Sequence, residues 1–222
     1  SVFHTRAEGK VEYTALLFIP SHAPYNLYYT DYEPGIQLYC QQVFIMDKCK
    51  DLLPDYLRFV KGLVDSPDLS LNISRELLQQ SRELKVIGRN LEKNILKTLE
   101  RTMKNNREKY EKFWAEFGKS LKIGIYNSMY SGEDTVSKLK DLLLFDSSKD
   151  GKLTSLKEYV DRMPESQKKI YYATAKDKET IEHLPQMETL RDKGLEVLYL
   201  LDPVDEFCIE TLREYDGKDR KS

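Results

Sequence analysis

The chain has 222 residues, of which 40% are hydrophobic and 32% are charged. This composition is typical of a soluble globular protein with one large domain or two smaller ones, and 15 Tyr, 8 Phe and one Trp exclude a disordered chain. The net charge of -2 lacks the basic excess of a nucleic-acid-binding protein. No apolar run approaches the roughly 18 residues that cross a bilayer, and no signal peptide is visible. We therefore expect neither nucleic acid nor a membrane among the partners.

The cysteine content gives an expectation about the compartment. Cys40, Cys49 and Cys208 cannot all pair within one chain, and they lack the spacing of metal ligands. Free thiols are typical of a reducing cytosol, so we expect a cytoplasmic protein. The chain begins without Met and enters an apparent strand almost at once, which indicates a fragment of a longer protein.

The first third predicts strands followed by a helix. Residues 10–20 alternate between apolar and polar side chains and then become apolar on both faces, which predicts a strand whose later half is covered on both sides. Residues 21–35 predict a long loop because they are rich in Tyr, Pro and Asp. Residues 36–46 predict one strand, and Pro54 then opens a predicted helix. Strands followed by helices favour a mixed α/β region.

The middle of the chain predicts helices. Apolar residues recur at three- and four-residue steps from Leu84 to Met103, which predicts a long amphipathic helix. The aromatic residues from Tyr110 to Phe117 predict a second helix that ends near Gly118. Residues 135–144 predict a short helix that connects the two halves. These apolar stripes indicate core packing and not a cofactor site.

The last third predicts alternating strands and helices. Ser155 and Glu158 have the spacing of a capping box, which predicts a helix that runs to about Met163. A strand, a helix and a strand joined by short connections imply a parallel pair with a right-handed crossover. The predicted elements after Met163 are a strand at 169–175, a helix at 178–193 stopped by Gly194, a strand at 195–201 and a helix at 205–215.

These elements predict an α/β protein with two α/β sandwich units joined by a helical linker region. The larger unit is expected at 1–106, the helical connector at 107–142 and the smaller unit at 143–222. We expect no internal repeat.

The usual catalytic motifs are missing. The chain has no glycine-rich phosphate loop, no HExxH, no paired CxxC and no nucleophile elbow. His4, His22 and His183 are scattered, so we predict no metal site. A stand-alone phosphate-processing enzyme has no support, because no nucleophile, base or metal can be assembled.

The segment LNISRELLQQ at residues 71–80 is the candidate site. Ser74 suits the N-cap of a helix that begins at Arg75. Arg75 and Gln79 would then share a helix face, with Asn72 just ahead of them in the loop. An arginine, an amide and free backbone N–H groups can bind an anion. Surface Arg and Gln at this spacing are also commonplace, so the residues alone leave a plain helix surface open.

The same segment resembles the catalytic loop in the middle segment of the heat-shock protein 90 chaperones. The resemblance continues through VFIMDKCKDLLPDYLRFVKGLVDSPDLSLNISRELLQQ at residues 43–80 and covers essentially the whole chain. The absence of the charged insertions of plant and animal members suggests the bacterial form. Further matching stretches lie at residues 18–28, 113–125, 155–175, 194–207 and 212–218.

This resemblance implies one segment of an ATP-driven chaperone that folds client proteins. In the family, an N-terminal domain binds ATP with Mg, and a C-terminal domain forms the homodimer. The resemblance therefore implies that the fragment is monomeric, binds no cofactor by itself and is no enzyme alone, although it forms part of an ATPase in the intact chaperone.

The resemblance also implies roles for individual residues. Arg75 matches the residue that reaches the γ-phosphate of ATP when the domains close, and Gln79 matches the second polar residue of that loop. Asn72 matches a supporting loop position. Phe44 matches an apolar residue at the contact with the N-terminal domain, although a strand phenylalanine is more commonly part of the core.

Three departures from the family pattern involve four residues. Gln41 and Gln42 stand where many relatives carry at least one arginine, so a charge contact there is lost or supplied elsewhere. Ser70 replaces a common proline, which predicts a more mobile loop before closure. His22 stands where a basic residue is frequent, so the charge of that loop depends on the protonation of the imidazole.

One alternative from another functional class stays open. The chain could be a plain protein-interaction module with no part in ATP hydrolysis. In that case Arg75 is only a surface residue of a helix. An ATPase assay on the fragment and on the intact protein would separate these hypotheses.

Overall fold

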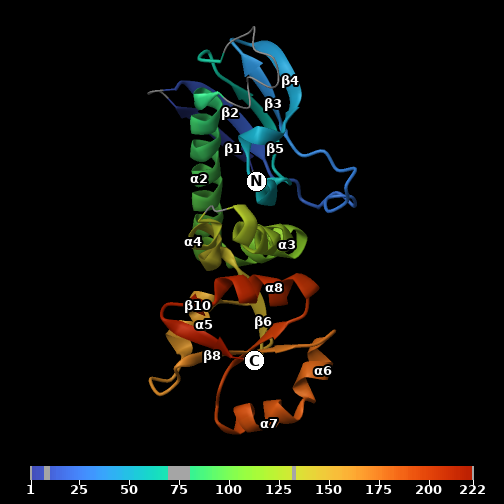
Figure 1. The fold of residues 1–222 in the computed structure, drawn as a ribbon, viewed down its shortest axis with the longest axis vertical. Helices are drawn as coiled ribbons and strands as arrows, with labels where there is room; N and C mark the ends of the chain where they lie inside the picture. Colours follow the sequence, from blue (N-terminus) through green and yellow to red (C-terminus); the bar gives the residue numbers. More distant parts are fainter. Residues whose placement is uncertain (1, 8–10, 70–80, 132–133, 222) are drawn as a thin grey trace. The chain divides into compact units, whose positions relative to one another are not determined.

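The computed structural model describes residues 2–7, 11–69, 81–131 and 134–221. The chain divides into two compact units, Ser1–Asn106 and Arg107–Ser222, which we call unit 1 and unit 2. Each unit contains one β-sheet with helices packed against it, as Figure 1 shows. The predicted α/β class is therefore confirmed. The connector expected at 107–142 falls within unit 2.

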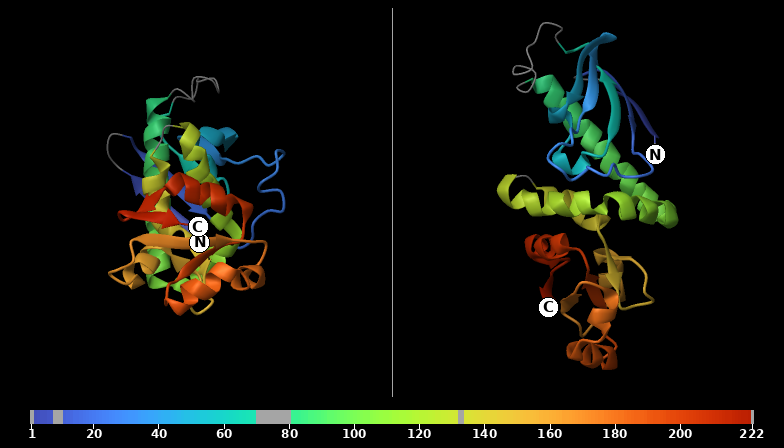
Figure 2. Two further views of the ribbon diagram at one scale, coloured as in Figure 1. Left: turned by 60° about the horizontal axis from the view of Figure 1, so that its bottom comes forward. Right: turned by 90° about the vertical axis from the view of Figure 1, so that its right-hand side faces the viewer.

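Unit 1 is built on a five-stranded sheet with the order β1-β2-β5-β3-β4. All neighbouring pairs are antiparallel except β3 and β5, which are parallel. Figure 2 shows a long helix, α2, running beside this sheet. The elements of unit 1 are β1 (Val2–Ala7), β2 (Tyr13–Phe18), β3 (Ile36–Cys40), β4 (Val43–Cys49), the 3-10 turns η1 (Lys50–Leu52) and η2 (Asp55–Leu57), β5 (Lys61–Asp65) and α2 (Arg82–Asn105).

The packing of unit 1 follows from side-chain periodicity. The predicted stripe of α2 is buried, from Leu84 to Leu99, which confirms the long amphipathic helix. Strand β2 alternates strictly between buried and exposed residues, because a strand sends successive side chains to opposite faces. The prediction that its later half is covered on both sides is wrong, since Leu16 and Phe18 are exposed.

Two further predictions in unit 1 are wrong. Residues 36–46 form two strands, because Gln41 and Gln42 adopt positive φ angles of 51° and 66° and reverse the chain. The predicted helix after Pro54 is only the short η2, followed by strand β5. Of the apolar residues spaced by three there, Leu57 lies in η2 and only Leu63 lies in β5, which pairs with β2 and β3, so tertiary pairing overrides the local pattern.

Unit 2 is built on a six-stranded sheet with the order β10-β11-β8-β9-β6-β7. Its elements are α3 (Arg107–Ser131), α4 (Thr135–Leu139), the 3-10 turn η3 (Lys140–Leu142), β6 (Leu144–Ser147), β7 (Thr154–Ser155), α5 (Leu156–Arg162), β8 (Lys169–Thr174), α6 (Lys178–Glu182), α7 (Pro185–Asp192), β9 (Val197–Leu200), α8 (Pro203–Leu212), β10 (Glu214–Tyr215) and β11 (Lys218–Lys221).

The centre of unit 2 is the parallel pair β8 and β9, as the strand–helix–strand pattern predicts. The predicted single helix between them is divided into α6 and α7, because Pro185 opens a new helix at its first position. All four residues of β9 are buried. Figure 1 shows α6 and α7 on one side of this sheet and α8 on the other, so helices cover both faces of the strand.

Helix α3 corrects another prediction, because it continues through Gly118 to Ser131. A Cβ atom at residue 118 would lie 2.5 Å from the ring of Trp114. The glycine therefore makes room for an indole ring and does not end the helix. The predicted capping box of Ser155 and Glu158 is confirmed at the start of α5.

All three cysteines are free, as predicted, and all three are buried. Burial raises the pKa of the Cys49 thiol to about 11 and that of Cys208 to about 12, because a thiolate in apolar surroundings loses its hydration. The thiols are therefore protonated and poorly reactive at neutral pH.

We expect the free energy of unfolding to fall at alkaline pH because of Cys49 and Cys208. The folded pKa lies above the unfolded value of about 8.5, so the stability is complete below that value and is lost as the pH rises above it. In that range each thiol lowers the free energy of unfolding by about 1.4 kcal/mol per pH unit, until the pH reaches its folded pKa. Urea unfolding at about pH 8 and about pH 10 measures this loss. A Cys49→Ala/Cys208→Ala variant should lose less, and an identical loss in both proteins would refute the assignment.

Candidate functional site

The predicted catalytic loop is framed by described residues at both ends. Arg75, Gln79 and Asn72, together with Ser70 and Ser74, lie outside the described residues. The flanking residues Leu69 and Ser81 are described, and they connect the loop to β5 and to α2. The described residues on either side therefore define the two ends of the candidate site.

Hydrogen bonds fix the chain where it leaves β5. The backbone N–H of Ser66 donates to the Tyr39 carbonyl at 3.2 Å. The Asp68 carboxylate accepts from the backbone N–H of Glu12 at 2.6 Å. Leu69 is buried, and its carbonyl accepts from the Cys40 thiol at 2.7 Å. The chain therefore enters residues 70–80 from a fixed position beside β3.

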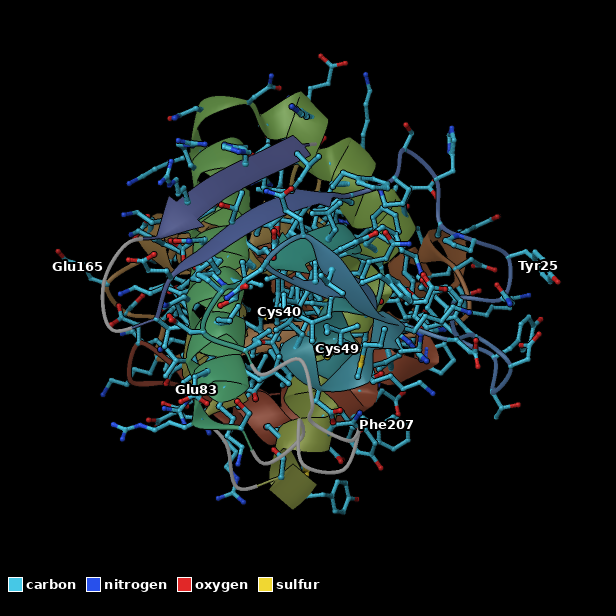
Figure 3. All side chains as sticks on the ribbon, turned by 90° about the horizontal axis from the view of Figure 1, so that it is seen from above. Tyr25, Cys40, Cys49, Glu83, Glu165 and Phe207 are labelled. Atoms are coloured by element: carbon cyan, nitrogen blue, oxygen red, sulfur yellow. The ribbon has the colours of Figure 1, made fainter. Side chains whose placement is uncertain are left out.

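The other end of the frame is the N-terminus of α2. The Ser81 hydroxyl accepts from the backbone N–H of Leu84 at 3.2 Å, which satisfies one of the free donors of the first turn. The same hydroxyl donates to Glu83 at 2.8 Å. Hydrogen bonds from its own backbone N–H and from Ser81 lower the pKa of Glu83. Figure 3 shows Glu83 on α2 in the same unit as Cys40.

The tip of the β3–β4 hairpin is bound to the end of β5. The backbone N–H of Gln42 donates to both carboxylate oxygens of Asp65, at 3.1 and 3.2 Å. Gln41 and Gln42 have the left-handed backbone that a two-residue hairpin turn requires. Their side chains are exposed. This departure from the family pattern therefore lies at a solvent-exposed turn.

Phe44 and its neighbour Val43 are exposed at this tip. Phe44 has 53% and Val43 has 51% of its surface accessible. The rings of Phe44 and Tyr39 pack in a T-shaped arrangement, with the ring centroids 5.6 Å apart and the planes at 74°. Contact with Tyr39 supports the ring but does not bury it. The sequence left two alternatives for Phe44, a core position and a contact with another domain. The exposure of the ring excludes the core position, and the interdomain contact stays a prediction.

The described residues around the predicted loop bring Phe44 close to the start of that loop. They also add Asp65 and Val43, which the sequence did not point to. Phe44 lies on the hairpin whose Cys40 contacts Leu69, immediately before residues 70–80. Asp65 was missed because its hydrogen bond to the hairpin joins residues far apart in sequence. Val43 was missed because an apolar residue in a strand usually predicts a core position.

No metal site arises in the described part of the chain. No group of three or more His, Cys, Asp or Glu residues there could hold a metal ion. The histidines remain apart: His4 is in β1, His22 is in the loop after β2, and His183 lies in contact with the Glu179 carbonyl at 2.7 Å. In the part of the chain that the structure describes, each helix is too short or too polar to span a bilayer.

Comparison with known proteins identifies the family. The family model described as Hsp90 protein matches residues 1–222. Proteins named Chaperone protein HtpG from Oceanobacillus iheyensis and Bacillus subtilis are each 52% identical over 219 residues. The same-named protein of Clostridium botulinum is 53% identical over 219 residues. Each match covers 99% of this chain.

The matches cover only part of these relatives. The chain spans 35% of the Oceanobacillus protein and 34% of the Clostridium and Bacillus proteins. The family model nevertheless extends from the first residue to the last. The chain therefore belongs to the Hsp90 family of chaperones, and within that family it is similar to bacterial HtpG.

Proposed function

We propose that this chain is the middle segment of an ATP-driven chaperone and that Arg75 contacts the γ-phosphate of ATP held by another domain of the longer protein. The motif at residues 71–80 and the family match over residues 1–222 support this proposal. Gln79 and Asn72 would support the same loop. On this account the chain completes an ATPase and has no turnover by itself.

The chemistry of phosphoryl transfer suits an arginine. Negative charge spreads over the oxygens of the γ-phosphoryl group in the transition state, and a guanidinium can donate two parallel hydrogen bonds to it. Because Arg75 would reach the phosphate only when the domains close, hydrolysis would depend on that conformational change. The nucleotide and its Mg would be held by residues outside this chain.

The observation that carries the proposal is the exposed tip of the hairpin that contacts Leu69, the last described residue before the predicted catalytic loop. Val43 and Phe44 offer an apolar contact surface, and Cys40 of the same hairpin holds Leu69 next to residue 70. A domain that docked on Phe44 would meet this chain close to the start of the predicted catalytic loop. An exposed aromatic side chain at such a position favours an interface over a purely internal role.

The loop after β2 offers a second exposed surface. Tyr25 has 89% and Tyr29 has 63% of its surface accessible, and Figure 3 shows Tyr25 at the outer end of this loop. Aromatic residues with a polar tip are common at protein interfaces. We include these tyrosines in the client-binding surface of the proposed chaperone.

The proposal predicts that Phe44→Ala lowers ATP hydrolysis by the longer protein about tenfold, because an interface aromatic contributes roughly 1–2 kcal/mol. The free energy of unfolding of the 222-residue chain should change by less than about 0.5 kcal/mol, because the ring is exposed. Steady-state phosphate release and urea unfolding measure the two effects.

Tyr25→Ala is the matched control, since it removes an even more exposed ring from a loop of the same unit. It should leave hydrolysis unchanged when no client protein is present. Equal hydrolysis by the Phe44→Ala and unaltered proteins would instead favour the alternative of a protein-interaction module without a role in hydrolysis.

A further inference from the structure

A basic groove lies at the edge of the unit 1 sheet, between β1 and the second half of α2. Figure 1 shows these two elements side by side. The groove has a volume of about 720 Å³. Its charged or titratable lining residues are His4, Arg6, Lys97, Glu100, Arg101 and Lys104.

One face of α2 supplies most of this charge. Lys97, Arg101 and Lys104 follow at steps of four and three residues, so they lie on the same side of the helix. All three are exposed. No ion pair between described residues uses any of them. Their charges are therefore available to a partner on the described surface.

The positive charge of the groove is local. The whole chain has a net charge of -2, yet among the described residues Glu100 is the only acidic one in the lining. Lys97, Arg101 and Lys104 outnumber this carboxylate within two helical turns, and like charges at this spacing repel one another. The groove therefore favours an acidic partner.

Strand β1 adds a second recognition element. It lies at the end of the strand order in its sheet, and within the described residues it pairs only with β2. His4, Thr5 and Arg6 all line the groove, although successive side chains of a strand point to opposite faces. The groove therefore runs along the edge of the strand, where backbone N–H and C=O groups lack a neighbouring strand.

We propose that the groove binds an extended acidic segment of a separate protein, which adds a strand to β1 and directs acidic side chains toward Lys97, Arg101 and Lys104. Addition of a strand satisfies both the donors and the acceptors of the β1 edge. A nucleic acid fits less well, because its phosphates cannot donate to the edge carbonyls and the described part of the lining has no Phe, Tyr or Trp on which bases would stack. Since β1 and β4 lie at opposite edges of the sheet, this surface is separate from Phe44.

A labelled peptide in which Glu and Val alternate is a direct probe of the groove. We expect the 222-residue chain to bind it, measured by fluorescence anisotropy, and to bind it less tightly as salt is added. A Lys97→Glu/Arg101→Glu variant should bind about tenfold more weakly or worse. Lys85→Glu is the matched control, because Lys85 is exposed on α2 but outside the groove. Circular dichroism should show that both variants are folded.

A second peptide separates strand addition from charge alone. N-methylation of alternate amides keeps every acidic side chain but blocks pairing with a strand edge, so this peptide should lose binding. Equal binding of the methylated peptide would overturn the proposal, as would failure to bind the unmodified peptide or equal weakening by Lys85→Glu. Tighter binding of oligothymidylate would favour nucleic acid instead. Binding that is lost in the longer protein would mean that its own chain fills the groove, and would also contradict the proposal.

Discussion

Replacement of Arg75 by alanine in the longer protein should lower the turnover number for ATP hydrolysis by about 10²–10³-fold, because it removes a preorganised donor to the γ-phosphoryl group. The affinity for ATP should change much less, since the arginine would reach the phosphate only in the closed state. Single-turnover hydrolysis and equilibrium nucleotide binding separate these quantities. The 222-residue chain alone should release no phosphate.

Two further substitutions make this test specific. Arg75→Lys keeps the charge but loses the fork of donors, so its turnover should lie between those of the unaltered protein and Arg75→Ala. Arg82→Ala removes an exposed arginine from the first turn of α2, and it should leave turnover unchanged. If Arg75→Ala hydrolyses ATP at the normal rate, Arg75 has no catalytic role.

Asp205→Asn should destabilise unit 2 by about 3–5 kcal/mol, because it leaves a buried ammonium group without its counterion. Asp205 and Lys122 form an ion pair in which the residues are only 3% and 8% exposed. The Lys122 ammonium also lies over the rings of Trp114 and Phe145, at 5.3 and 5.0 Å. Asparagine can still accept the hydrogen bonds that Asp205 receives from the backbone N–H groups of Leu201 and Asp202, but it carries no charge.

A double-mutant cycle isolates the charge effect in this prediction. Lys122→Met removes the ammonium and keeps an unbranched side chain, so Lys122→Met/Asp205→Asn should recover most of the stability lost in Asp205→Asn. Urea unfolding of the four proteins measures the coupling. Strict additivity of the two single substitutions would contradict the description of a coupled buried pair.

Much of the fold could be predicted from local patterns. The apolar stripe of α2, the capping box of Ser155 and Glu158, and the parallel pairing of β8 with β9 all follow from residues close in sequence. These features depend on helical periodicity, on N-cap chemistry and on short connections. Local physics is sufficient for each of them.

The sequence-based predictions of local structure were wrong where contacts between distant residues determine the fold. The turn at Gln41 and Gln42 carries no glycine or asparagine signal, and Asp65, a residue distant in sequence, accepts a hydrogen bond from its backbone. The role of Gly118 depends on the position of the Trp114 ring. For the candidate site, the motif at residues 71–80 could be read from the sequence, whereas the exposure of Phe44 required the structure.

The most direct test is a structure of the longer protein in its closed form with a non-hydrolysable ATP analogue and Mg. We predict that the guanidinium of Arg75 lies within hydrogen-bonding distance of the terminal phosphate, about 2.7–2.9 Å for a charged pair, with Phe44 covered by the nucleotide-binding domain. An Arg75 side chain surrounded by solvent in that closed form, with another cation on the phosphate, would contradict the proposed function.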